Sequence, residues 1–189
     1  MTHTQTSNSL YPGMLCKGVE FFAVEGEMKF IKDGHVLPLN QLPFAIIQLG
    51  NEEIESHPEV AKALQEWHPN SKFNQLQQFL QCRYGGLDFS ADMENNQFKE
   101  GDYWNCPSRK TCPFNGIICK APKVNNQELT ALEIDLMILK STNKINQVIA
   151  DELNLALGSF HKASKILYQK LGVQTRQEIT VKAHELNLI

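Results

Sequence analysis

Four cysteines in the middle of the chain are the residues best suited to chemistry. The stretch NCPSRKTCPFNGIICK, residues 105–120, contains Cys106, Cys112 and Cys119, and Cys82 precedes it. Four thiolates satisfy the tetrahedral coordination of Zn²⁺, so we expect Cys82, Cys106, Cys112 and Cys119 to hold a structural zinc ion. Paired C-x-x-C motifs are missing, and Cys-Pro pairs such as those at 106 and 112 also occur around iron–sulfur clusters. An iron–sulfur cluster, a thiol-based sensor and unligated buried cysteines therefore remain alternatives.

The segment that contains these cysteines has little else to fold around. From residue 82 to 123 the chain is rich in Gly, Pro and polar residues, without sustained helical or strand periodicity. Such a stretch is uncommon inside a compact domain unless something holds it, and metal binding supplies folding energy directly. Cys16 lies far from this segment, so we expect it to be a free thiol, although it could replace Cys82 as a ligand.

Composition and charge exclude several classes of protein. The 189 residues carry a formal net charge of −3, so affinity for nucleic acid requires a local basic patch. No apolar run approaches the ~20 residues of a membrane span, and clustered cysteines are typical of metal or redox sites in a reducing compartment. We expect a cytoplasmic protein without membrane association. His35, His57 and His68 lie in separate segments without a partnered Ser or Cys motif, which predicts that the protein is not an enzyme.

The N-terminal two thirds of the chain predict an α+β domain, residues 1–121. Short apolar and aromatic runs between residues 18 and 36 surround Asp33-Gly34, a strong turn pair, and indicate a small antiparallel β unit. Two helices are expected between residues 58 and 82, from the spacing of their apolar residues. The cysteine-tethered loop follows, and residues 122–127, PKVNNQ, are expected to form a linker.

The C-terminal region, residues 128–189, predicts four short helices. Thr130 with Glu133, and Thr175 with Glu178, have the spacing of capping boxes, in which the two side chains satisfy first-turn amides reciprocally. Gly172 is a suitable residue to end the longest helix. The predicted architecture is therefore an N-terminal α+β domain followed by an all-α domain.

A basic helix face is expected in this C-terminal domain. No Asp or Glu occurs from Leu153 to Gln177. On a helix over residues 158–171, an apolar stripe of Phe160, Ala163, Leu167 and Leu171 faces inward. The outward residues are then His161, Lys162, Lys165 and Gln169. A short helix, a tight turn and a second helix with a basic face suit the major groove of DNA.

Residues 129–189 resemble, without a gap, the LuxR-type helix-turn-helix domain of many bacterial response regulators. The residues that carry the resemblance are Leu129-Thr130, Glu133, Leu136, Leu139, Ile149-Ala150, Leu153, Lys170-Leu171-Gly172-Val173, Arg176 and Leu188-Ile189.

The resemblance implies that the second helix of the pair enters the major groove and that the fourth helix packs between the subunits of a homodimer. By position, His161, Lys162 and Lys165 would contact bases or nearby phosphates. Ser159 and Lys170 would contact the DNA backbone, Gln169 would lie on the same face, and Arg176 would order the turn.

The combined interpretation is a bacterial transcriptional regulator that binds double-stranded DNA as a homodimer. Leu132 and Ala163 stand where the family usually has Arg and His, so a protein-interaction or dimerisation module that has lost DNA contact is one alternative. A redox sensor based on the cysteine cluster is the other.

Overall fold

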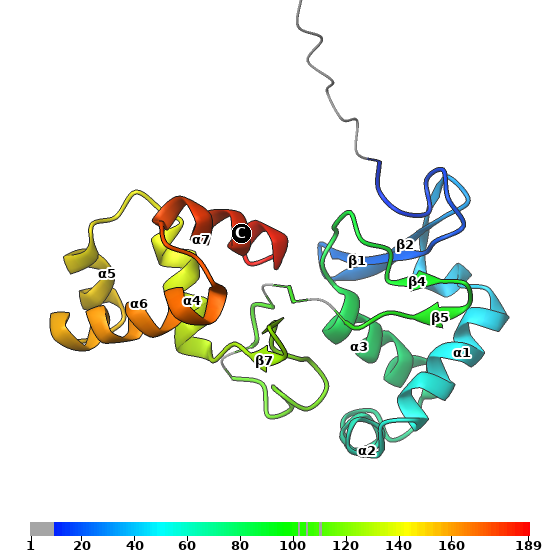
Figure 1. Ribbon diagram of the computed structural model, residues 1–189. Helices are drawn as coiled ribbons and strands as arrows, with labels where there is room; N and C mark the ends of the chain where they lie inside the picture. Colours follow the sequence, from blue (N-terminus) through cyan, green and yellow to red (C-terminus); the bar gives the residue numbers. More distant parts are fainter. Residues whose placement is uncertain (1–9, 102, 105, 110) are drawn as a thin grey trace, which may run out of the picture. The chain divides into compact units, whose positions relative to one another are not determined.

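The computed structural model of the protein describes residues 10–101, 103–104, 106–109 and 111–189 (Figure 1). Within these ranges the chain contains seven α-helices and small antiparallel sheets, which confirms the predicted α+β class. None of the described helices is long and apolar enough to cross a membrane. The chain divides into two compact units. The described residues of 1–102 and 106–120 form the N-terminal unit, and those of 103–105 and 121–189 form the C-terminal unit. The first nine residues of the predicted N-terminal domain lie outside the described residues.

A three-stranded antiparallel sheet begins the N-terminal unit. Its strands are β1 (Glu20–Val24), β2 (Glu27–Lys32) and β3 (His35–Pro38), in that spatial order. Asp33 and Gly34 join β2 to β3 with φ angles of 51° and 81°, and positive φ at both positions is what a two-residue hairpin loop requires. Phe21 pairs with Phe30 across β1 and β2, and both rings are fully buried. The predicted β unit is therefore confirmed.

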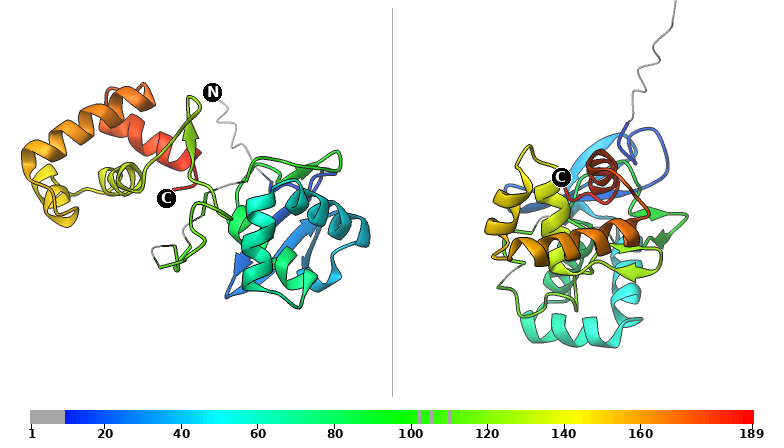
Figure 2. Two further views of the ribbon diagram at one scale, coloured as in Figure 1. Left: turned by 90° about the horizontal axis from the view of Figure 1, so that it is seen from below. Right: turned by 60° about the vertical axis from the view of Figure 1, so that its left-hand side comes forward.

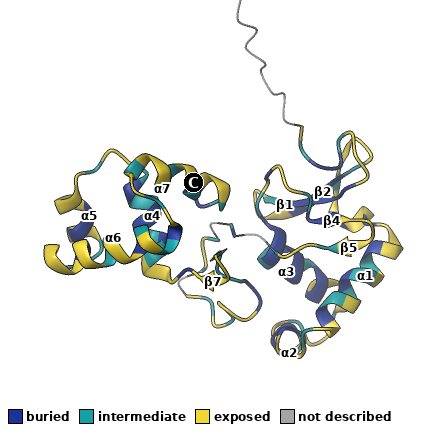
Figure 3. Ribbon diagram, in the orientation of Figure 1, coloured by how far each residue is buried: buried dark blue, intermediate teal, exposed yellow. Residues whose placement is uncertain are grey.

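Three helices complete the core of this unit: α1 (Phe44–Glu55), α2 (Pro58–Trp67) and α3 (Lys72–Tyr84). The helices α2 and α3 are the two predicted from apolar spacing, whereas α1 was not predicted. α3 packs against β1, α1 and α2, and buried residues concentrate along it (Figure 3). The helix α3 is therefore the central helix of the unit.

Turns and short pairings dominate the region after α3, as its composition predicts. A small hairpin joins β4 (Met93–Glu94) to β5 (Gln97–Phe98). The described residues of 106–120 contain turns and one isolated bridge between Asn115 and Cys119, but no regular helix or strand. Ile118 in this segment is fully buried in the core of the N-terminal unit, so the loop is anchored there.

Four helices form most of the C-terminal unit: α4 (Ala131–Lys140), α5 (Asn146–Glu152), α6 (Leu157–Leu171) and α7 (Arg176–Glu185), which two further views follow from other directions (Figure 2). Both predicted capping boxes are confirmed, at the start of α4 and of α7. Gly172 ends α6 with a φ of 68°, as predicted for a left-handed residue at a helix end. The predicted four short helices are all present.

The segment expected as a linker, residues 122–127, instead carries two short strands. β6 (Lys123–Val124) pairs with β7 (Gln127–Glu128) through Asn125 and Asn126, whose φ angles are 52° and 62°. Asn adopts left-handed φ more readily than most other non-glycine residues, so the Asn-Asn pair forms a tight hairpin turn. Leu129, directly after β7, is buried in the core of the C-terminal unit.

Candidate functional site

The element with the predicted basic face is α6, which follows α5 after a tight turn. Asn154 adopts a φ of 54°, and the Leu155 N–H donates to the Ala150 carbonyl at 2.9 Å. A left-handed residue followed by this hydrogen bond is a common way to end a helix and reverse the chain. α5 and α6 pack against each other and against α4. The two helices and their turn therefore form one packed pair.

One face of α6 is buried and the opposite face is exposed. Phe160, Leu167 and Leu171 lie in the core, and Ser164 takes a fourth buried position, whereas Ala163, expected in the core, is half-buried. Five of the predicted DNA-contacting residues are exposed along the other face: Ser159, His161, Lys162, Lys165 and Gln169. Because α6 contains no Asp or Glu, no acidic side chain of this helix offsets their charge.

A buried lysine that was not predicted holds α6 in place. Lys140, at the end of α4, is 4% exposed. Its Nζ lies 4.9 Å from the centre of the Phe160 ring and 5.3 Å from that of Tyr168, so the ammonium contacts the negative faces of two rings on α6. Burial lowers the pKa of Lys140, and the charge of Arg176 lowers it further. No local sequence pattern indicates this contact, because Lys140 is distant from both rings in the sequence.

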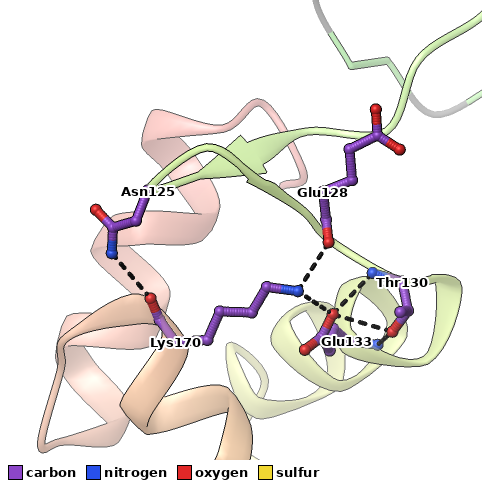
Figure 4. A network of polar contacts seen from close by, with 5 residues as sticks. All are labelled: Asn125, Glu128, Thr130, Glu133 and Lys170. Atoms are coloured by element: carbon purple, nitrogen blue, oxygen red, sulfur yellow. Dashed lines mark hydrogen bonds and ion pairs between the residues drawn. The ribbon is translucent and has the colours of Figure 1, made fainter.

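Lys170, predicted to contact the DNA backbone, is engaged inside the C-terminal unit (Figure 4). Its Nζ donates to the Glu128 carbonyl at 2.7 Å and to Glu133 Oε2 at 2.8 Å. The same carboxylate accepts the Thr130 N–H at 2.8 Å and the Thr130 hydroxyl at 3.0 Å. Burial raises the pKa of Glu133, but the hydrogen bonds from Lys170 and Thr130 outweigh it and hold the pKa below its ordinary value. The structure thus uses Lys170 to join α6 to the start of α4.

Arg176 is also engaged within the unit. Its Nε donates to the Lys140 carbonyl and its Nη2 donates to the Thr142 carbonyl. The last carbonyls of a helix lack partners within the helix, so Arg176 satisfies the end of α4 from the first turn of α7. These contacts lie at the connection between α4 and α5, and the expected role of Arg176 in ordering the turn stays a prediction. With Lys170 and Arg176 both engaged, Lys162 and Lys165 are the permanent cations on the exposed face of α6.

Two of the four predicted metal ligands, Cys106 and Cys112, open matching turns, and Cys82 lies on α3. The Arg109 N–H donates to the Cys106 carbonyl at 3.1 Å, and the Asn115 N–H donates to the Cys112 carbonyl at 3.3 Å. Each of these cysteines is thus the first residue of a β-turn whose second residue is proline, a favoured position for proline because its ring presets φ. Cys119 follows the second turn, and its Sγ lies 3.4 Å from Asn115 Oδ1.

The cysteine loop docks beside the last turn of α3, where Cys82 lies. Ile118 is fully buried, and its carbonyl accepts a hydrogen bond from Arg83 Nε. The Phe114 ring packs on Trp67 at the end of α2, with 4.9 Å between ring centres. Cys82 itself packs against the core of the N-terminal unit. These contacts bring the loop to the helix that carries the first cysteine.

Cys82 is a half-buried thiol whose pKa is raised. Burial raises the pKa of its thiol to about 11, a hydrogen bond from Gln78 lowers it, and charge interactions with the other three thiols raise it. All five cysteines of the chain are free thiols, and Cys16 is exposed. In the described part of the chain, no three His, Cys, Asp or Glu side chains are already arranged to hold a metal ion. The four thiols therefore do not form a ready coordination sphere.

Comparison with protein-family models, with curated proteins and with solved structures finds no match to this chain. The geometry of α6, and that of Cys82 on α3 with the three cysteines of the loop, is therefore what the structure contributes to a functional assignment.

Proposed function

We propose that the protein is a bacterial transcriptional regulator that binds double-stranded DNA through α6, the second helix of a LuxR-type helix-turn-helix. The observation that supports this most directly is the exposed face of α6. It presents Lys162 and Lys165 with His161 and Gln169, on a helix that contains no acidic residue. The resemblance of residues 129–189 to the LuxR-type domain supports the same function.

The chemistry of this face suits both the backbone and the bases of DNA. Lysine ammonium groups neutralise phosphates, and the major groove admits an α-helix. Ile166 lies four residues after Lys162 on the same side of α6 and is 50% exposed, which offers apolar surface of the kind that contacts thymine methyl groups. Ser159 lies near the start of α6, where recognition helices commonly contact DNA.

A homodimer is part of the proposal. A single small module offers too little interface for high affinity, and dimers double the contacts by binding two half-sites. The resemblance assigns the subunit contact to the fourth helix. Val181 on α7 is 56% exposed and supplies apolar surface on that helix.

Binding of the full chain to mixed genomic DNA fragments at two salt concentrations tests the proposal. The test variant is Lys162→Ala with Lys165→Ala. The matched control is Lys62→Ala with Lys72→Ala, which removes two exposed lysines from α2 and α3 in the N-terminal unit. We expect the α6 variant to bind DNA about tenfold or more weakly. The slope of the logarithm of the binding constant against the logarithm of the salt concentration should also fall in magnitude by about 2, since each phosphate contact contributes about 1 to it.

The control variant should bind DNA as the unchanged protein does, and circular dichroism should show the same helix content in all three proteins. Equal losses in both variants would indicate a bulk charge effect and contradict the role of α6. Absence of DNA retention at low salt would contradict DNA binding itself. That second result would favour the protein-interaction or dimerisation module, for which exposed Ile145, Leu157 and Ile166 supply apolar surface.

A further inference from the structure

We propose that Cys82, Cys106, Cys112 and Cys119 together bind one Zn²⁺ ion, and that the buried guanidinium of Arg83 compensates the negative charge of the site. This inference goes beyond DNA binding and concerns the N-terminal unit alone. Three independent features support it: two matching turns, the docking of the loop beside α3, and a buried cation next to the thiols.

The first feature is the local geometry of two ligands. Cys106 and Cys112 open β-turns of the same kind, each with proline at the second position and the same hydrogen bond from the fourth residue to the first. Proline restricts the backbone before any metal arrives, which lowers the conformational entropy that ordering the loop costs. Two of the four thiols are therefore presented by short, preset turns on an otherwise irregular segment.

The second feature is the position of the loop against α3. The Arg83 side chain holds the Ile118 carbonyl, and the Trp67–Phe114 contact holds the preceding turn. Because Cys82 precedes Arg83 and Cys119 follows Ile118, this hydrogen bond joins the immediate neighbours of the first and last cysteines. The segment that carries Cys112 and Cys119 is thus held against the helix that carries Cys82.

The third feature is the charge of Arg83. Arg83 is 3% exposed. A guanidinium stays ionised even when it is buried, and a buried cation requires nearby negative charge. Among the described residues, no carboxylate lies within ion-pair distance of Arg83. Its guanidinium lies over the Phe79 ring, 5.5 Å from the ring centre, and Tyr84, Glu53, Cys119 and Cys82 interact with its charge. Neutral thiols supply no net charge. Four thiolates around one Zn²⁺ carry a net charge of −2 and would compensate it.

The support around Cys82 also suits a metal ligand. The Gln78 side-chain amide donates to Cys82 Sγ at 3.3 Å, and hydrogen bonds of this kind orient ligands around protein-bound metals. Since the thiols are not yet arranged around a common point, zinc binding must turn the loop thiols toward Cys82 and release the thiol protons to solvent. The loop would then gain the order that its few apolar residues do not provide.

Metal analysis of the full chain, purified with and without added Zn²⁺, tests this proposal. We expect about one zinc ion per chain. Cys82→Ser, Cys106→Ser, Cys112→Ser and Cys119→Ser should each release most of it to a competing chromogenic chelator, whereas Cys16→Ser serves as the matched control and should retain it.

A second measurement on the unchanged protein covers the case in which a serine variant fails to fold. Alkylation followed by mass spectrometry should modify Cys16 readily and protect the other four thiols while zinc is bound. Adding a strong chelator should expose the partly accessible Cys82, Cys106 and Cys112 before the buried Cys119, with no change at Cys16. Three results would overturn the proposal: no zinc bound at any supply, reactive Cys106 and Cys112 in the zinc-loaded protein, or iron with inorganic sulfide and visible absorbance in anaerobically purified protein.

Discussion

Replacing Lys170 with Met distinguishes a structural lysine from one that contacts DNA. The structure places the Lys170 ammonium between the Glu128 carbonyl and the Glu133 carboxylate, with side-chain exposures of 13% for Lys170 and 15% for Glu133. Methionine retains most of the apolar stem but removes both hydrogen bonds. Hydrogen bonds that involve a charged group each contribute about 1.5–3 kcal/mol, and partial exposure reduces their combined effect. We therefore expect Lys170→Met to lower the free energy of unfolding of the C-terminal unit by about 2 kcal/mol.

Lys182→Met provides the matched control. Lys182 pairs with Glu185 on α7, but the two side chains are 38% and 53% exposed. Exposed ion pairs contribute little, so this change should alter the free energy of unfolding by no more than about 0.5 kcal/mol. The Glu133→Gln variant completes a double-mutant cycle with Lys170→Met, and we expect the pair to be coupled by about 1 kcal/mol or more.

Pulsed hydrogen exchange in urea, followed on peptides from residues 128–189, measures unfolding of this unit in the full chain. An effect of Lys170→Met as small as that of Lys182→Met would refute the reasoning, because it would show that the network is not desolvated. If such a stable variant also lost affinity for DNA, Lys170 would instead be the backbone contact that the sequence predicted.

Three further predictions use the same measurement. The hydrogen bonds to Glu133 hold the pKa of its carboxyl below the ordinary value of about 4.5. The stability that Glu133 contributes is therefore present above pH 4.5 and is lost as the pH falls below it. Glu133→Gln should reduce the loss of stability on acidification, and an unchanged pH profile would contradict this. Phe160 is fully buried beneath Lys140, so Phe160→Ala should lower the free energy of unfolding by about 3–5 kcal/mol. Leu157 is 40% exposed, so Leu157→Ala should lower it by less than about 1 kcal/mol. Asn154→Val should lower the free energy of unfolding by about 1–2 kcal/mol, because φ at this position is 54° and a β-branched residue disfavours that angle. Asn154→Gly should be tolerated. Similar losses for both variants would show that the left-handed turn is not essential.

The sequence by itself predicted the features that depend on interactions between residues close together in the chain. Asp33-Gly34 predicts a hairpin because few other residue pairs accept positive φ twice in succession, and the structure has that turn. The two capping boxes and Gly172 predicted helix ends from hydrogen bonds that span only three or four residues. The helical spacing of apolar residues along residues 158–171 predicted which side of α6 is buried. The structure differs from that prediction in one position, because Ser164 rather than Ala163 is buried.

Local patterns failed where an element has no such marker. The helix α1 begins after Pro43 without a side-chain cap and without an acidic residue in its first turn, so it lacks these two signals of a helix start. The Asn125-Asn126 turn has loop-like composition, and only its φ angles identify a hairpin. Both elements are tied to a core: Ile46 and Ile54 of α1 are buried in the N-terminal unit, and Leu129, directly after the hairpin, is buried in the C-terminal unit.

The tertiary structure alone decided which charged groups are available for function. Lys170 pairs with a carboxylate 37 residues earlier in the chain, Lys140 lies beneath the rings of α6, and Arg83 reaches the Ile118 carbonyl across 35 residues. Contacts over such separations depend on how the helices and loops pack, and no repeat or spacing in the sequence encodes them. The types of residue that suit zinc and DNA were therefore visible in the sequence, but burial and pairing determined which lysines face solvent and which cation is buried next to Cys82.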